Sequence, residues 1–217
     1  MKYLSAEKMR ETDRYAIEEL KIPGIVLMEN AVIKFISNLD LSKDKYLVAA
    51  GGGNNGGDGF GIARHLKVLG KDVKVALLGD SARIKGDAKI NFDILEELEI
   101  PVIEINDMNW HELEDYSEEA DIIIDAILGT GLDLDITGYY KYSIAIINSS
   151  EKPVYAVDLP SGLNATTGKI MGIAVKAVKT VTFQYMKEGF QNEESKEYTG
   201  EVVVENIGIP EWVKDRV

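Results

Sequence analysis

The sequence has no cysteine and only two histidines, His65 and His111. The absence of cysteine excludes disulfides, thiolate nucleophiles, iron–sulfur clusters and zinc–thiolate sites. The two histidines do not have the H-x-H or H-x-x-x-H spacing of a paired ligand set, so a histidine-based metal site is not expected.

The sequence also lacks an excess of basic residues and any long apolar run. Its 24 Lys and Arg residues are outnumbered by 37 Asp and Glu residues, which gives a formal net charge of −13. An acidic chain without a basic stripe binds nucleic acid and anionic membrane surfaces poorly. No stretch approaches the roughly 18 apolar residues of a membrane span, and the first residues lack the apolar segment of a signal peptide. We therefore expect a cytoplasmic protein with no nucleic-acid or membrane partner.

The 217 residues, of which 45% are apolar, match the length of one domain, and we expect residues 1–217 to form it. Short apolar runs alternate with stretches of helical periodicity, which predicts βαβ units and a parallel sheet covered by helices on both faces. The expected fold is a three-layer αβα, Rossmann-like sandwich with a mostly parallel sheet and two N-terminal helices. Strands are predicted at residues 46–50, 73–78, 102–105, 122–124, 154–157, 180–183 and 202–204, and helices at 5–20, 25–39, 62–69, 88–98, 110–119 and 139–147.

A glycine cluster follows the first predicted strand, with six glycines between residues 51 and 59. Glycine permits positive φ and close backbone approach, and the N–H groups that begin the next helix can meet an anion. Gly51, Gly53 and Gly56 also fit the pattern G-x-G-x-x-G. Asp58 is a candidate N-cap of that helix, where its carboxylate would repel a phosphate. The cluster therefore favours hydrogen bonds to hydroxyl groups, or within the loop itself, over a simple diphosphate site.

Two more strand ends carry polar side chains and turn residues. Asp125 follows the strand at 122–124, with further backbone donors at Gly129-Thr130-Gly131. Asp158 and Ser161 follow the strand at 154–157. Ligands of such sheets bind beyond the carboxyl ends of the strands, near the point where strand order reverses. We therefore expect these segments and the glycine cluster to meet in one crevice.

The motifs together resemble those of the YjeF N-terminal domain family, the NAD(P)HX epimerases. The resemblance rests on three blocks in the same order, which are Asn-Asn-Gly-Gly-Asp-Gly at 54–59, Asp-Ala with Gly-Thr-Gly-Leu at 125–132, and Ala-Val-Asp-Leu-Pro-Ser-Gly-Leu at 156–163. It extends over nearly the whole chain.

The resemblance implies an isomerase of nicotinamide-cofactor repair. Such enzymes interconvert the R and S forms of hydrated NADH or NADPH, and a partner dehydratase then restores the cofactor from the S form. We expect Asp158 to act as the general acid and base for loss and re-addition of water at C6, with Asp58 as the substitute candidate. The family's substrate-binding positions fall on Asn54, Asn55, Gly56, Gly57, Asp58, Gly129, Thr130, Gly131, Leu132, Asp133, Leu134, Asp135 and Asp158.

The resemblance also implies a potassium site on Asn55, Asp125 and Ser161, a separate NAD(P)HX dehydratase as functional partner, and a homodimer. One carboxylate with amide, hydroxyl and carbonyl oxygens suits a large monovalent cation better than Mg²⁺. Many relatives carry a basic residue where this chain has Asp133-Leu134-Asp135, which leaves open how the phosphate end of the substrate is held. Lys187 is either a phosphate ligand or a solvated lysine.

Two alternatives stay open from the residues alone. An NAD-dependent oxidoreductase would use G-x-G-x-x-G, with Asp80 after the second strand as the ribose-binding acid. A non-catalytic nucleotide-binding module would bind the same ligands without turnover.

Overall fold

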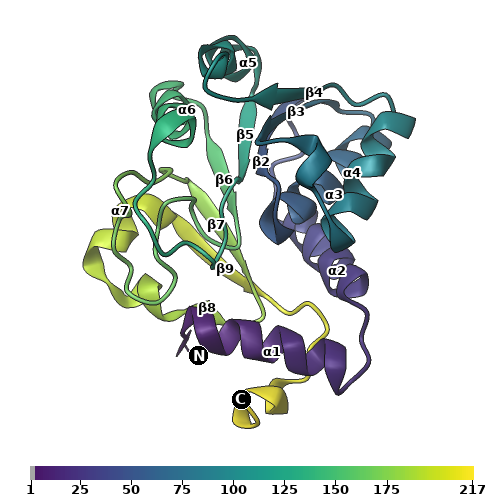
Figure 1. Cartoon of the computed structure of the whole chain (residues 1–217), viewed down its shortest axis with the longest axis vertical. Helices are drawn as coiled ribbons and strands as arrows, with labels where there is room; N and C mark the ends of the chain where they lie inside the picture. Colours follow the sequence, from purple (N-terminus) through teal and green to yellow (C-terminus); the bar gives the residue numbers. More distant parts are fainter. Residues whose placement is uncertain (1–2) are drawn as a thin grey trace.

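The computed structural model describes residues 3–217, and its main sheet consists of seven parallel strands (Figure 1). The strand order is β4-β3-β2-β5-β6-β7-β9. The strands are β2 (Lys45–Gly51), β3 (Asp72–Leu78), β4 (Val102–Ile105), β5 (Ile122–Ala126), β6 (Val154–Val157), β7 (Lys179–Phe183) and β9 (Glu201–Glu205). The predicted parallel sheet is confirmed.

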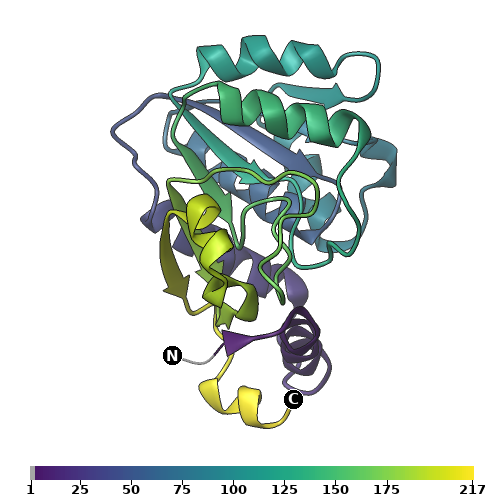
Figure 2. The same cartoon turned by 90° about the vertical axis from the view of Figure 1, so that its left-hand side faces the viewer.

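Helices cover both faces of the sheet. Neighbouring residues of a strand point to opposite sides, so each face presents apolar side chains that helices bury. In β2, Val48 and Ala50 belong to the core beneath one set of helices, whereas Leu47 and Ala49 belong to the core beneath the other. Helices α2 (Gly24–Ser37), α3 (Asn54–Val68) and α4 (Gly86–Glu97) pack on the first face, and α5 (Leu113–Glu119) and α6 (Gly138–Ser149) lie side by side on the second (Figures 1 and 2). The three-layer αβα architecture is therefore confirmed.

The strand order reverses between β2 and β5. From β2 the chain winds outward through β3 and β4, then returns to place β5 on the other side of β2 and winds outward again. Adjacent connections leave in opposite directions at this point, so a crevice opens beyond the carboxyl ends of β2 and β5.

Helix α1 (Ala6–Glu18) lies outside the three layers, next to the carboxyl edge of the sheet (Figure 1). Ser5 caps it, because its Oγ accepts a hydrogen bond from the Lys8 backbone N–H. Before the helix, β1 (Tyr3–Leu4) pairs in parallel with β8 (Met186–Lys187). At its other end, Tyr15 contacts Trp212 edge-to-face near the C-terminus. These contacts hold α1 against residues from the last quarter of the chain.

The glycine cluster differs from the prediction. Helix α3 begins at Asn54 and not near residue 62, and its N-cap is Gly53, so Asp58 is not the cap. No glycine from Gly51 to Gly59 has a positive φ. They are needed for close approach: a Cβ on Gly56 would lie 1.7 Å from the Gly51 carbonyl oxygen, and one on Gly59 would lie 2.6 Å from the Ala126 Cβ. The absent side chains thus let the start of α3 pack directly on the ends of β2 and β5.

The remaining elements are short. They are the 3₁₀ turns Ser81–Arg83, Trp110–Glu112, Glu188–Gln191, Glu193–Ser195 and Glu211–Asp215, and the helix α7 (Lys196–Thr199). Within residues 3–217, none of the helices has both the length and the apolar character needed to cross a bilayer.

Candidate active site

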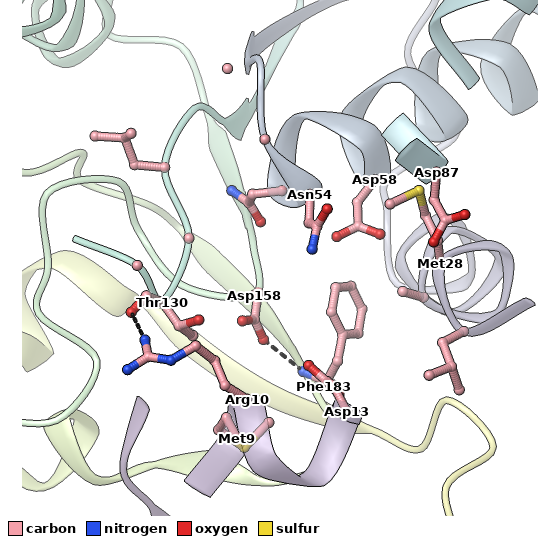
Figure 3. Close-up of a pocket in the computed structure, with 18 of the residues that line it drawn as sticks. Met9, Arg10, Asp13, Met28, Asn54, Asp58, Asp87, Thr130, Asp158 and Phe183 are labelled. Carbon is pink, nitrogen blue, oxygen red and sulfur yellow. Dashed lines mark hydrogen bonds between the residues drawn. The ribbon is translucent and has the colours of Figure 1, made fainter. Parts of the chain in front are cut away.

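A cavity of about 590 Å³ lies beyond the carboxyl ends of the central strands (Figure 3). Its walls come from the turn between β2 and α3, the loop that follows β5, and the ends of β6 and β7. Helices α1 and α2 close the remaining sides with residues such as Met9 and Met28. The predicted crevice therefore exists, and the N-terminal helices form part of it.

The structure places the residues of the predicted site in three groups. The cavity is lined by Asn54, Asn55, Asp58, Gly129, Thr130, Gly131, Leu132 and Asp158. Asp125 and Ser161 are fully buried behind this wall. Gly56 and Gly57 are buried inside α3, and the exposed residues Asp133, Leu134 and Asp135 are outside the lining.

Asp158 stands directly after β6 in a left-handed backbone conformation, with φ of 67°. Aspartate tolerates this region better than most residues, and the turn directs its side chain to the cavity. Its Oδ1 accepts hydrogen bonds from Lys187 Nζ at 2.5 Å, Thr182 Oγ1 at 3.1 Å and the Phe183 N–H at 3.1 Å. No donor among the described residues reaches Oδ2, which leaves this oxygen for a ligand.

Lys187 fits neither of the roles considered from the sequence. Its side chain is fully buried, and Nζ donates to Asp158 Oδ1 and, at 3.2 Å, to the carbonyl oxygen of Phe183. The expectation of a solvated lysine is wrong, and the contacts of Nζ within the protein do not support a phosphate ligand. Lys187 instead fixes one oxygen of Asp158 and offsets its charge.

Among the further carboxyl groups that line the cavity, those of Asp58 on α3 and Asp13 on α1 lie close enough to Asp158 to be affected by its charge (Figure 3). Burial raises the pKa of Asp58 well above its usual value. The negative charges of Asp158 and Asp13 raise this pKa further, whereas the positive charge of Lys187 lowers it. Burial also raises the pKa of Asp13 to about 6. The positive charge of Lys187 opposes this rise, and the negative charge of Asp158 adds to it. Carboxyl groups with raised pKa in a cavity are typical of acid–base sites.

Sequence reasoning missed the contribution of α1. Met9, Arg10 and Asp13 all line the cavity, yet no motif marks them. One signal was present: Asp13 stands between the buried residues Met9 and Ala16 at helical spacing. A carboxylate on the buried stripe of a helix needs a partner or a function.

Asp125 and Ser161 join the loops that follow β5 and β6. Asp125 Oδ2 accepts the Ser161 backbone N–H at 2.7 Å, and Oδ1 accepts the Ser161 hydroxyl at 2.5 Å. Burial raises the pKa of Asp125 to about 6, while the hydrogen bonds from Ser161 oppose the rise. Asp125 is the fourth residue of β5 and does not follow the strand as the sequence suggested.

Asn55 lies against the same loop as Ser161. A Cβ placed on Gly129 would be 3.3 Å from the Asn55 Cβ, and Ser161 Oγ accepts the Leu128 N–H at 2.8 Å. The Asn55 side-chain nitrogen is buried and has no hydrogen-bond partner in the described part of the chain. The amide group therefore has unused hydrogen-bonding capacity next to Ser161 and Asp125.

Asp80, the acid that a dehydrogenase would need for the ribose, is engaged elsewhere. Its Oδ1 accepts the Ala82 N–H at 2.9 Å at the start of a 3₁₀ turn, and its Oδ2 lies 3.4 Å from Arg83 Nε. Asp80 is not among the residues that line the cavity. This geometry gives the oxidoreductase alternative no support.

Comparison with known proteins agrees with this picture. A family model described as YjeF-related protein N-terminus matches residues 24–189. NAD(P)H-hydrate epimerase from Oenococcus oeni is 39% identical over 213 residues, which cover 96% of this chain and 98% of that protein. The bifunctional NAD(P)H-hydrate repair enzyme Nnr from Moorella thermoacetica is 37% identical over 218 residues, which cover 97% of this chain and 41% of that protein.

The fold has a counterpart among solved structures. The crystal structure of yeast ynu0 (YNL200c) superposes with a TM-score of 0.79 at 23% sequence identity, covering 95% of this chain and 88% of that one. From the match over residues 24–189 and the near full-length curated relatives, the chain belongs to the YjeF N-terminal family, as its motifs predicted.

Proposed function

We propose that the chain is an NAD(P)H-hydrate epimerase that interconverts the R and S forms of hydrated NADH or NADPH. Near full-length relatives carry the name of this activity. The observation that carries the proposal is the site itself: Asp158, with one oxygen held by Lys187 and the other free, shares a cavity with Asp58. The substrate class is hydrated nicotinamide dinucleotide.

Asp158 and Asp58 have complementary environments for moving a proton. Donors from Lys187, Thr182 and Phe183 hold one oxygen of Asp158 and leave the other oxygen for a proton, whereas burial raises the pKa of Asp58 well above its usual value. Two carboxyl groups in different environments are typical of acid–base sites. We therefore assign the acid role to Asp58 and the base role to Asp158 in one direction of the reaction.

The reaction balances without any other reactant. Asp58 protonates the C6 hydroxyl, the C6–O bond breaks as the lone pair of the ring nitrogen forms an iminium, and water leaves. Water then adds to the opposite face of C6, Asp158 takes its proton, and proton exchange with solvent returns Asp58 and Asp158 to their starting states. The two side chains come from different walls of the cavity, which suits departure and arrival on opposite faces (Figure 3). The reverse direction exchanges the two roles.

Replacement of Asp158 by Asn tests the proposal. We expect the epimerisation rate to fall by about 10²–10⁴-fold, since a positioned acid or base contributes that much. Stereospecific NMR of an R/S mixture of NADHX, with an S-specific dehydratase added, measures the rate at which the R form is consumed. Asp115→Asn, on the exposed surface of α5, is the matched control. Near-wild-type turnover by Asp158→Asn would refute the assignment.

A potassium ion fits the residues behind the cavity wall. Asp125, Ser161 and Asn55 would hold it, and rotation of the Asn55 amide would direct Oδ1 to the place where the buried nitrogen now lacks a partner. When bound, the ion would offset the negative charge of the substrate.

At constant ionic strength, K⁺ should raise the melting temperature of the wild type above its value in Na⁺, and Asn55→Ala should reduce the difference. Equal melting temperatures in the two salts would exclude the site.

We propose that the product passes to a dehydratase that accepts the S form. The Moorella thermoacetica relative is named as a bifunctional NAD(P)H-hydrate repair enzyme, which supports coupling to a second repair activity. A homodimer, which the family resemblance implies, is also part of the proposal. Light scattering on the purified protein would decide it, since a monomer mass at working concentration would contradict a dimer.

A further inference from the structure

The charge balance of the cavity leaves one cation for the phosphates of a dinucleotide. The acidic side chains in its lining are Asp13, Asp58, Asp87 and Asp158, and the basic ones are Arg10 and Lys187. Lys187 is fully buried and engaged by Asp158. A diphosphate needs positive charge or N–H donors to replace its water. Among the residues that line the cavity, Arg10 is the cation that remains.

Arg10 stands where it can take this role. It projects from α1 toward the loop after β5, and its Nη1 lies 3.4 Å from the carbonyl oxygen of Thr130 (Figure 3). This is a long hydrogen bond, and no other acceptor in the described part of the chain engages the guanidinium. A guanidinium has five N–H donors in a planar fork that matches phosphate oxygens. Most of its hydrogen-bonding capacity is therefore unused.

The loop beside Arg10 adds unused backbone donors. Gly129, Thr130 and Gly131 line the cavity, and their N–H groups donate to no acceptor within residues 3–217. Small residues at 129 and 131 leave these groups accessible to a ligand. Donors from Arg10 and from this loop thus face the same part of the cavity.

We infer that Arg10 binds the diphosphate of the substrate beside the loop Gly129–Gly131, whose contact with the substrate the family resemblance already implies. This inference rests on the proposed function for the identity of the substrate. It answers the question raised by Asp133-Leu134-Asp135, where a basic residue is absent from the loop. The positive charge comes from α1, far away in the sequence and adjacent in space.

The binding of ADP-ribose, measured by titration calorimetry, tests the inference. ADP-ribose contains the diphosphate but no nicotinamide, so its binding does not depend on catalysis. We expect Arg10→Gln to weaken binding by about 10- to 100-fold, as for loss of a charge-assisted hydrogen bond. Arg10→Lys keeps the positive charge without the planar fork, so its affinity for ADP-ribose should lie between those of the wild type and Arg10→Gln. Arg14→Gln, on the exposed side of the same helix, should bind like the wild type.

Kinetics separates binding from a structural role of Arg10. For NADHX, Arg10→Gln should raise KM about tenfold or more with little change in kcat, since the lost contact is made equally in the ground and transition states. Inhibition by nicotinamide riboside, which has no phosphate, should be unchanged. If Arg10 only fastens α1 to the loop, both ligands will weaken together, and the inference is wrong. Arg10→Gln that binds ADP-ribose within twofold of wild type would also overturn it.

The outcomes distinguish this inference from the proposed function. Wild-type protein that fails to epimerise NADHX but binds ADP-ribose through Arg10 would refute the function and leave the anion site standing. If the wild-type protein epimerises NADHX and Arg10→Gln binds ADP-ribose normally, the proposed function stands and the inference about Arg10 is refuted.

Discussion

Asp13 gives the site a pH dependence that stability measurements can detect. Burial raises its pKa to about 6 from an ordinary value of 3.8, so between these values the folded protein binds more protons than the unfolded chain. The contribution of Asp13 therefore destabilises the fold as the pH rises through this window, and the full cost is present above pH 6. We predict that Asp13→Asn stabilises the protein by about 1–3 kcal/mol at pH 8 and by little at pH 4.

Urea unfolding of both proteins at several pH values measures the difference. Asp58 and Asp125 also have raised pKa values, so the wild-type curve alone cannot isolate Asp13, and the difference between variants is the relevant quantity. Asp107→Asn, at an exposed position outside the cavity, serves as control. A gain that is equal at pH 4 and pH 8 would show that Asp13 is ionised at no cost in the folded state.

At the level of single residues, the sequence predicted what strand ends reveal. Asp158 and Asp125 were identified because a carboxylate at the end of a buried strand stands where parallel sheets bind ligands. Arg10 and Asp13 were not, since their position depends on the pairing of β1 with β8, near opposite ends of the chain. The role of Lys187 was also out of reach, because its burial follows from the turn after β7.

At the level of elements, the start of α3 is the feature that the sequence concealed. Six glycines between residues 51 and 59 favoured a loop because glycine weakens helices by about 1 kcal/mol per residue relative to alanine. The helix nevertheless begins at Asn54, since its packing on the sheet requires residues without side chains. The sequence predicted the close approach of the backbone but not the helical conformation, because glycines allow close approach both in a loop and at the start of a helix.

We predict that Gly56→Ala destabilises the protein by at least about 2 kcal/mol, although alanine is the better helix former. The new Cβ would lie 1.7 Å from the Gly51 carbonyl oxygen, and neither backbone segment can move without shifting the wall of the cavity. Gly52→Ala is the control, since its nearest neighbour beyond the adjoining residues would be 3.9 Å away. Urea midpoints of the two variants provide the measurement. Equal midpoints would mean that the contact relaxes easily.

At the level of the whole molecule, the alternation of strands and helices was sufficient to predict the layers and the edge that carries the site. Each predicted strand from residue 46 onward is present, and the reversal between β2 and β5 brings the three predicted segments together. The position of α1 was not predictable, because a helix outside the layers can cover either edge. That helix supplies both Arg10 and Asp13, so the electrostatics of the site emerge only from the complete fold.

The net charge of −13 sets a long-range field against which the local donors must act. An anionic dinucleotide approaching this protein is repelled at low salt, where the screening length is about 30 Å at 0.01 M, and much less at 0.15 M, where it is about 8 Å. The attraction of Arg10 acts at contact and is screened less.

We therefore predict that kcat/KM for NADHX rises severalfold between these ionic strengths, with K⁺ held constant and tetramethylammonium chloride varied. Arg10→Gln should show a steeper rise, because it retains the repulsion without the local attraction. A kcat/KM that falls with salt would instead mean that the donors around Arg10 dominate the field of the whole molecule.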